Sequence, residues 1–133
     1  MISAGYRGAL SNSTRGVIVG GSTAPASTVQ DAMDHITIAS TGNAVDFGNL
    51  VGGRESPGCG SSGVRGIIAG GSAANEIMYI MISTTGNTQD FGDLLAGATT
   101  ITGCSNSTRC VFGGIRNPGY VTDMEFITIA STG

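Results

Sequence analysis

Ser40-Thr41-Gly42-Asn43-Ala44-Val45-Asp46-Phe47-Gly48-Asn49-Leu50 returns in changed form as Thr84-Thr85-Gly86-Asn87-Thr88-Gln89-Asp90-Phe91-Gly92-Asp93-Leu94. The opening of the phrase occurs a third time, as Ser-Thr-Gly at 131–133. We interpret the chain as almost three copies of one repeated unit. A unit of this size cannot bury a core alone, so neighbouring units are expected to pack against each other.

Two more series keep the same register as the phrase. In the first, an Arg begins an apolar run that ends in a Gly pair, and Arg15, Arg65 and Arg109 recur at intervals of 50 and 44 residues. The second series is centred on an aromatic slot and covers 33–39, 77–83 and 124–130. These intervals are typical of four-stranded propeller blades.

Every part of the unit is predicted to be a strand. The Val/Ile runs are short, β-branched and bounded by Gly pairs, and Ile36 and Ile38 alternate with Thr37 as in a two-faced sheet. A small-residue strand is expected before each Arg, at about 5–12, 57–62 and 100–106. The Thr-Gly-Asn steps predict tight chain reversals. The fold class is therefore all-β, with about two and three-quarter four-stranded blades.

Expected blade boundaries are 5–51, 56–96 and 100–133, and the third blade lacks its last strand. The unit varies in length mainly after each Gly pair, at 22–32, 72–76 and 115–122. Such variation at one point of a repeat places the variable loops on one face, which is often the binding face. Within these loops, Arg116, Asn117 and Tyr120 are the residues chosen as candidates for contact with a glycan or protein.

The composition excludes several classes of function. The formal net charge is −3 and only 11% of the residues are charged, which disfavours nucleic acid because a basic face is needed there. No stretch approaches the roughly 20 apolar residues that span a bilayer, so membrane insertion is not expected.

The side chains that suggest chemistry align with repeated architecture. His35 is the single histidine, and Tyr79 and Phe126 occupy its slot in the other units, which indicates packing rather than catalysis. Without further histidines no metal site is predicted, and no cofactor or enzymatic activity is expected. Cys59, Cys104 and Cys110 lie in small-residue slots and are interpreted as small buried thiols, with a bridge between blades as the alternative.

The recurring charged and aromatic positions have two interpretations. Arg15, Arg65 and Arg109, together with Asp46 and Asp90, could form a ring for an acidic ligand. The favoured interpretation is structural, as Arg–Asp pairs or Arg-to-backbone clamps between adjacent strands, because a planar guanidinium satisfies several acceptors. Phe47 and Phe91 are expected to fill the place of an outer-strand aromatic.

The Arg-to-Gly-Gly strand, variable loop and aromatic strand resemble the kelch type of β-propeller repeat. Ser13-Thr14-Arg15-Gly16-Val17, with Ile36-Thr37-Ile38-Ala39-Ser40-Thr41-Gly42-Asn43 and the Asp-Phe-Gly-x-Leu phrase, resembles the kelch-like repeats of structural and tail-fibre-associated proteins of tailed bacteriophages, notably marine cyanobacterial ones. The resemblance covers the chain from Gly5 onward, lacks the usual Trp, and is shorter than the usual arrays.

The resemblance implies a non-enzymatic virion structural or adhesive protein, located on the virion or outside the cell, whose partners are other virion proteins or a host-surface glycan. The alternative is a cellular or secreted kelch-type or lectin-like binding module. Because open sheet edges invite pairing, we also expect a homo-oligomer, most simply two chains that complete a six-bladed ring.

Overall fold

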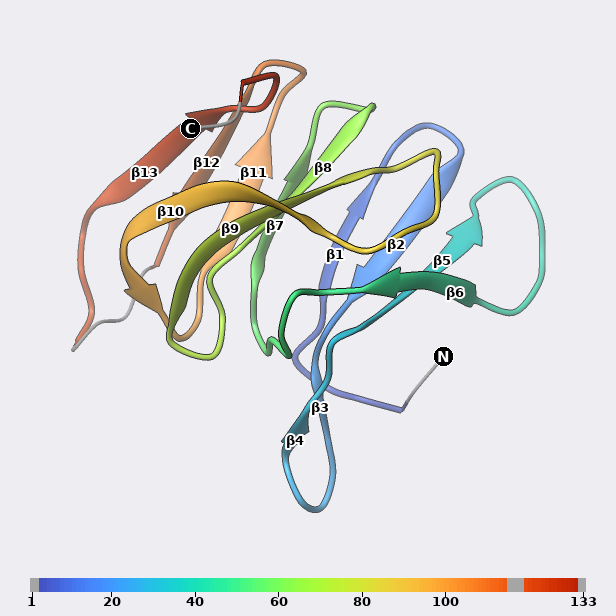
Figure 1. Cartoon of the computed structure of the whole chain (residues 1–133), viewed down its shortest axis with the longest axis horizontal. Coiled ribbons are helices and arrows are strands. Elements are labelled where there is room, and N and C mark those ends of the chain that lie inside the picture. The colour runs from blue at the N-terminus through green and yellow to red at the C-terminus, as the bar shows by residue number, and fades with distance from the viewer. Residues whose placement is uncertain (1–2, 115–118, 132–133) are drawn as a thin grey trace.

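The computed structural model describes residues 3–114 and 119–131, and over these residues it is an all-β molecule without helix (Figure 1). This confirms the predicted fold class at the level of all-β. Three antiparallel sheets follow one another along the chain and lie side by side in Figure 1, and a short hairpin projects below them. No helix in the described ranges could cross a bilayer.

Each sheet is built from consecutive segments of the chain. The first has the order β1 (Gly8–Ser11), β2 (Arg15–Val19), β5 (Ala32–Thr37) and β6 (Val45–Asn49). The second contains β7 (Gly58–Ser61), β8 (Arg65–Ala69), β9 (Ala74–Met81) and β10 (Gln89–Ala98). The third contains β11 (Thr102–Ser105), β12 (Arg109–Gly113) and β13 (Met124–Thr128). The hairpin pairs β3 (Ser22–Thr23) with β4 (Thr28–Val29).

Register explains why the sequence series align. Val17 lies opposite His35, Ile67 opposite Tyr79 and Val111 opposite Phe126, so the aromatic slot has one place in all three sheets. The Gly pairs end the Arg strands because both glycines of a pair adopt positive φ at Gly20–Gly21 and Gly70–Gly71. A side chain with a Cβ adopts that conformation only with strain.

The core lies between the sheets. Between the first and second sheets, buried apolar side chains of β2, β5 and β6 pack on those of β8 and β9, and Phe47 is 2% exposed. Between the second and third sheets, Phe91 belongs to a cluster with Phe112 and Ile129. Both cores are therefore shared between two sheets, so one unit is not expected to fold alone.

The first strands of the three sheets are close neighbours. The Ser61 hydroxyl donates to the Ser11 carbonyl at 2.6 Å, and the Ser105 hydroxyl donates to the Ser61 carbonyl at 2.9 Å. A Cβ added at Gly103 would lie 2.6 Å from the Cys59 carbonyl oxygen, so only glycine permits this approach of β11 to β7. Small residues in these strands are thus explained by packing between sheets.

The Thr-Gly-Asn step was predicted to make the tight reversal, but in both units the chain turns just before it, where the Ser40 N–H donates to the Thr37 carbonyl and the Thr84 N–H to the Met81 carbonyl. Residues 86–88 instead cross to the outer strand of the first sheet, where the Gly86 N–H donates to the Phe47 carbonyl and the Thr88 N–H donates to the Asn49 carbonyl. A Cβ at Gly48 would collide with the Gly86 backbone, which explains the glycine of the Asp-Phe-Gly phrase. The repeated phrase therefore joins two sheets.

The prediction that all three cysteines are buried is wrong. Cys110 is buried as expected, but Cys59 is only partly buried and Cys104 is exposed. Cys59 lies opposite Ile68 and Cys104 opposite Val111, so the two occupy neighbouring register positions and face opposite sides of their sheets. All three are free thiols, so the alternative of a bridge between blades is wrong in this structure.

Candidate functional site

The connections that follow β2, β8 and β12 leave their sheets at the same end, because these strands hold equivalent places in the three sheets. We call this the loop end. In Figure 1 the β3–β4 hairpin and the β8–β9 connection lie at this lower end of the molecule. The first two variable loops predicted from the sequence therefore lie on one side.

The predicted contact residues are only partly described. Arg116 and Asn117 fall in 115–118, outside the described residues. Tyr120 is 90% exposed. The segment 72–76 is shorter than expected as a loop, because β9 already begins at Ala74. The segment 22–32 contains a hairpin that the sequence reading did not anticipate.

Backbone and ionic contacts hold the loop end in place. The N–H groups and carbonyls of Gly5 and Ser22 exchange two hydrogen bonds of 2.9 Å, which tie the chain before β1 to the hairpin. A 2.9 Å ion pair joins Arg54 to Glu76, so the connection after the first sheet is anchored to β9. The loop end is thus a structured surface within the described part of the chain.

Two hollows adjoin at the loop end, and Tyr6 lines both. One, of about 330 Å³, lies between the chain before β1 and the hairpin and is lined by the hydroxyl side chains of Ser22, Thr23 and Ser27. The other, of about 360 Å³, lies over the starts of the first strands. The Tyr6 side chain is 73% exposed. An exposed aromatic ring beside convergent hydroxyl groups is an arrangement that suits a polar ligand with an apolar face.

Tyr6 was not predicted from the sequence because candidate contact residues were expected only in the variable loops, and Tyr6 lies before the first of them. Its backbone is left-handed, with φ of 55°, and Ser56 at the start of the second unit has φ of 54°. The first two units therefore share this conformation, while the aromatic side chain is particular to the first unit. The strand register makes the two residues equivalent, and the Ser56 N–H donates to the Tyr6 carbonyl at 2.8 Å.

An ion pair lies behind Tyr6. Arg7, which lines the second hollow, approaches Asp34 of β5 at 3.5 Å, and both side chains are 11% exposed. A largely buried Arg–Asp pair holds the chain before β1 onto the first sheet. This restrains the residue next to Tyr6.

The recurring arginines contact the neighbouring sheet. Nη1 of Arg15 donates to the Ile82 carbonyl at 3.0 Å, and Nη1 of Arg65 donates to the Ile129 carbonyl at 2.8 Å. The contact is an Arg-to-backbone bond, but it joins two sheets instead of two strands of one sheet. Asp46 and Asp90 are exposed, while the side chains of Phe47 and Phe91 are buried.

Each arginine also lies near an aromatic ring. The guanidinium of Arg65 is 4.4 Å from the Tyr79 ring centre and that of Arg109 is 4.7 Å from the Phe126 ring centre. Arg15 is 6.0 Å from Phe47, which His35 contacts edge-on. In the second sheet, the aromatic residue of the slot therefore supports the arginine that bonds to the next sheet.

Titratable groups do not gather into a metal centre. Among residues 3–114 and 119–131, no three His, Cys, Asp or Glu side chains could hold a metal ion together. Burial, with Cys110 nearby, raises the pKa of Cys59 to about 12. Burial, with Cys104 nearby, raises the pKa of Cys110 to about 12. Both thiols are therefore protonated and weakly nucleophilic at neutral pH.

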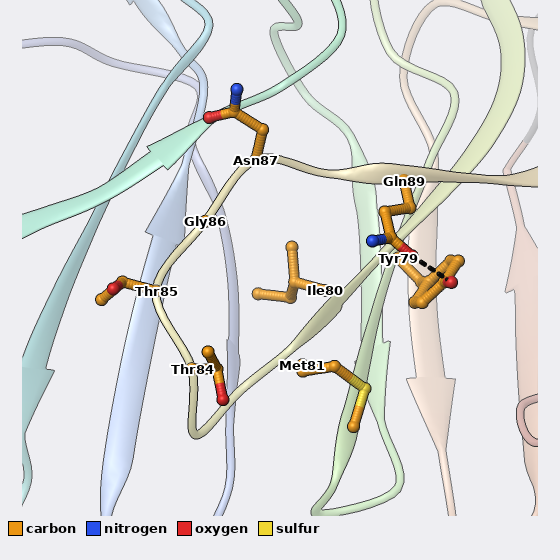
Figure 2. A pocket seen from close by; sticks show the side chains of 8 residues that line it. All are labelled: Tyr79, Ile80, Met81, Thr84, Thr85, Gly86, Asn87 and Gln89. Carbon is orange, nitrogen blue, oxygen red and sulfur yellow. Dashed lines mark hydrogen bonds between the residues drawn. The ribbon is translucent and has the colours of Figure 1, made fainter.

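A smaller pocket, of about 190 Å³, lies between β9, β10 and the connection that joins them (Figure 2). Three of its polar side chains already have partners. The Tyr79 hydroxyl donates to Oε1 of Gln89, and Oδ1 of Asn87 accepts the Asn49 N–H at 2.9 Å. This pocket is a weaker candidate than the loop end for these reasons.

No protein-family model matches the chain, and no curated protein matches it.

Proposed function

We propose that the three sheets are consecutive kelch-like propeller blades. Support comes from the shared strand order, from the adjacent first strands β1, β7 and β11, and from the Arg-to-carbonyl bond that recurs between successive sheets. Face-to-face packing of repeated four-stranded sheets around a central line of first strands is the construction of a propeller.

On this architecture we propose a non-enzymatic structural or adhesive function, of the kind that the resemblance to tailed-phage virion proteins implies. The loop end is the binding surface, and a surface glycan is its ligand. Tyr6 carries this proposal, because its exposed ring adjoins two hollows and hydroxyl groups line one of them. Sugars offer C–H faces that pack on aromatic rings and hydroxyls that exchange hydrogen bonds with polar side chains.

Binding of the purified full chain to an array of bacterial surface glycans tests the proposal. Tyr6→Ala is expected to abolish binding and Tyr6→Phe to retain most of it, since the ring and not its hydroxyl makes the apolar contact. Because Tyr6 is exposed, its truncation is expected to change the unfolding free energy by less than about 0.5 kcal/mol. Equal binding by the wild type and Tyr6→Ala would contradict the assignment of the site.

Tyr120→Ala is the matched control, since Tyr120 is also an exposed tyrosine that directly follows a glycine. Loss of binding in Tyr120→Ala alone would move the site to the third variable loop. For the virion role, a fixed copy number of the chain in purified phage particles is the expected result. A soluble cellular source without particles would favour the alternative of a lectin-like module.

A further inference from the structure

The contact between successive sheets is the same at both sheet interfaces. Besides the arginine bond, a small-residue slot recurs. A Cβ added at Gly66 of the second sheet would lie 2.6 Å from Leu10 of the first. A Cβ added at Gly60 of the second sheet would collide with Sγ of Cys110 in the third. By strand register, Leu10 of the first sheet has the same position as Gly60 of the second. Gly66 of the second sheet has the same position as Cys110 of the third.

The contact has a fixed direction. Of two successive sheets, the one that comes first along the chain provides the arginine and, from its first strand, the residue at the position of Leu10 or Gly60. The later sheet supplies the accepting carbonyl, the slot of Gly66 or Cys110, and a serine hydroxyl that donates to the earlier first strand. Every sheet therefore has one face built to contact the following sheet, which we call its earlier half, and one face built to contact the preceding sheet, which we call its later half.

The third sheet carries an earlier half that no described residue covers, which we call the donor face. It contains Cys104, Arg109, Met124 and Phe126. Cys104 is exposed, and Met124 and Phe126 are 74% and 60% exposed. The Arg109 guanidinium contacts the Phe126 ring, and no described carbonyl accepts from it. Exposed apolar side chains around a guanidinium are typical of an unformed interface.

The first sheet carries the matching later half, which we call the acceptor face. It contains Ser11, Gly16, Ile36 and Ile38. Ile36 and Ile38 are 38% and 52% exposed, and they border a shallow hollow of about 340 Å³. Register makes Ile38 equivalent to Ile82 and Ile129, whose carbonyls accept from arginines, yet no described residue donates to the Ile38 carbonyl.

We propose that the donor face of one copy packs on the acceptor face of a second copy and repeats the contact found within the chain. Arg109 then donates to the Ile38 carbonyl, Cys104 packs on Gly16, and the Ser11 hydroxyl donates to the Ser105 carbonyl. The inference rests on the proposed blade architecture. A second copy is the occupant because one chain carries both halves, each with the repeat's own complementarity.

Two copies joined in this way at both faces close a ring of six sheets. A head-to-tail contact that closes leaves no unpaired face, whereas one that does not close produces an open filament. The closed pair buries the exposed Ile and Phe side chains of both faces, which stabilises the assembly through the hydrophobic effect.

A disulfide tests this contact directly. Cys104 and Gly16 are equivalent to Gly60 and Cys110, which lie in contact, so Gly16→Cys in one copy would meet Cys104 of the next. The substitution suits the fold, since the nearest atom to a Cβ at Gly16 is Ile36 Cγ1 at 3.4 Å and a cysteine already occupies this register position in the third sheet. After mild oxidation of the full chain, a covalent dimer is expected on a non-reducing gel.

Two matched variants control this experiment. Gly16→Cys with Cys104→Ser is expected to give no dimer. Leu95→Cys adds an exposed thiol on β10 of the second sheet, outside both faces, and is expected to give only background crosslinking. Gly16→Cys crosslinking no better than Leu95→Cys would overturn the proposed contact. A ladder of longer covalent chains would overturn the closed two-copy ring.

Sedimentation tests the same contact without new thiols. The wild type is expected at twice the 13.2 kDa of the chain. Arg109→Ala is expected to raise the dissociation constant about tenfold or more, as for loss of a hydrogen bond from a charged donor, with an unchanged circular dichroism spectrum. A folded wild type that sediments as a monomer would overturn the proposal. Glycan binding is tested by Tyr6 variants at the loop end, and the contact between copies is tested by crosslinking and sedimentation. Failure of one proposal is therefore distinguishable from failure of the other.

Discussion

Nη1 of Arg65 lies 2.8 Å from the carbonyl oxygen of Ile129, and this bond joins the second sheet to the third. The same guanidinium rests 4.4 Å from the Tyr79 ring centre. A repeated arginine thus bonds to a backbone group 64 residues away and stacks on an aromatic ring of its own sheet. Inter-sheet cohesion depends on this double contact as well as on apolar packing.

Arg65→Ala is expected to lower the unfolding free energy by about 1.5–3 kcal/mol, because it removes a hydrogen bond from a charged donor and the stacking on Tyr79. Arg65→Lys keeps the charge but not the planar group, so it is expected to recover only part of the loss. Urea denaturation followed by circular dichroism measures both. Asp90→Ala is the control on an exposed position, where a change within about 0.5 kcal/mol is expected. A stable Arg65→Ala that loses a ligand would instead support the acidic-ligand interpretation.

Phe91→Ala is expected to lower the unfolding free energy by about 3–5 kcal/mol, since Phe91 is 3% exposed and its truncation leaves a cavity between the second and third sheets. Phe91→Leu keeps most of the side-chain volume, so its unfolding free energy is expected to fall less than that of Phe91→Ala. Leu95, in the same strand, is 92% exposed, so Leu95→Ala serves as the matched control. A similar decrease in melting temperature for Leu95→Ala and Phe91→Ala would contradict the burial of Phe91 between the second and third sheets.

Gly103→Ala is expected to destabilise the chain by about 1–3 kcal/mol, as overpacking does. The added methyl would meet the backbone of Cys59, which cannot rotate away as a side chain could. Gly42→Ala is the control, because no atom lies within 4 Å of a Cβ there. Equal melting temperatures for the two variants would show that β7 and β11 are not in close contact.

Stability is expected to fall as the pH rises from about 9 to about 12, partly because of Cys110. Burial raises the pKa of Cys110 from 9.0 to about 12, so its neutral thiol is favoured by folding. This contribution is fully present below the pKa of the unfolded chain and is lost as the pH rises through the folded pKa. The unfolding free energy that this thiol contributes is expected to fall by at most about 1.4 kcal/mol per pH unit.

Comparison with Cys110→Ala isolates this thiol, since other groups titrate equally in both proteins. The free energy of unfolding, measured in urea from pH 8 to 11, is expected to fall less steeply for Cys110→Ala. Parallel profiles would argue against a buried thiol. Iodoacetamide at pH 8 provides an independent check, in which Cys110 reacts only after denaturation.

The strands could be predicted because their signals are local. Alternating β-branched residues such as Ile36 and Ile38, together with glycine pairs that permit positive φ, identify strands and their ends without knowledge of distant contacts. The alignment of His35 with Tyr79 and Phe126 likewise placed one slot correctly in three sheets.

The candidate site was harder to predict, because a site depends on which segments meet. Nothing near Tyr6 in the sequence indicates that hydroxyl groups of the hairpin would lie beside it. The exposure of Cys104 followed from a register difference of one residue, which reverses the face of a strand.

By itself, the sequence determined the repeat, its all-β character and the positions of its strands, since backbone preferences and hydrophobic alternation act over a few residues. Only the tertiary structure decided that Arg65 would bond to Ile129, that Gly86 would cross to Phe47, and that the donor and acceptor faces would remain uncovered among the described residues. These contacts depend on how sheets pack face to face, and packing joins residues whose separation along the chain carries no local signal.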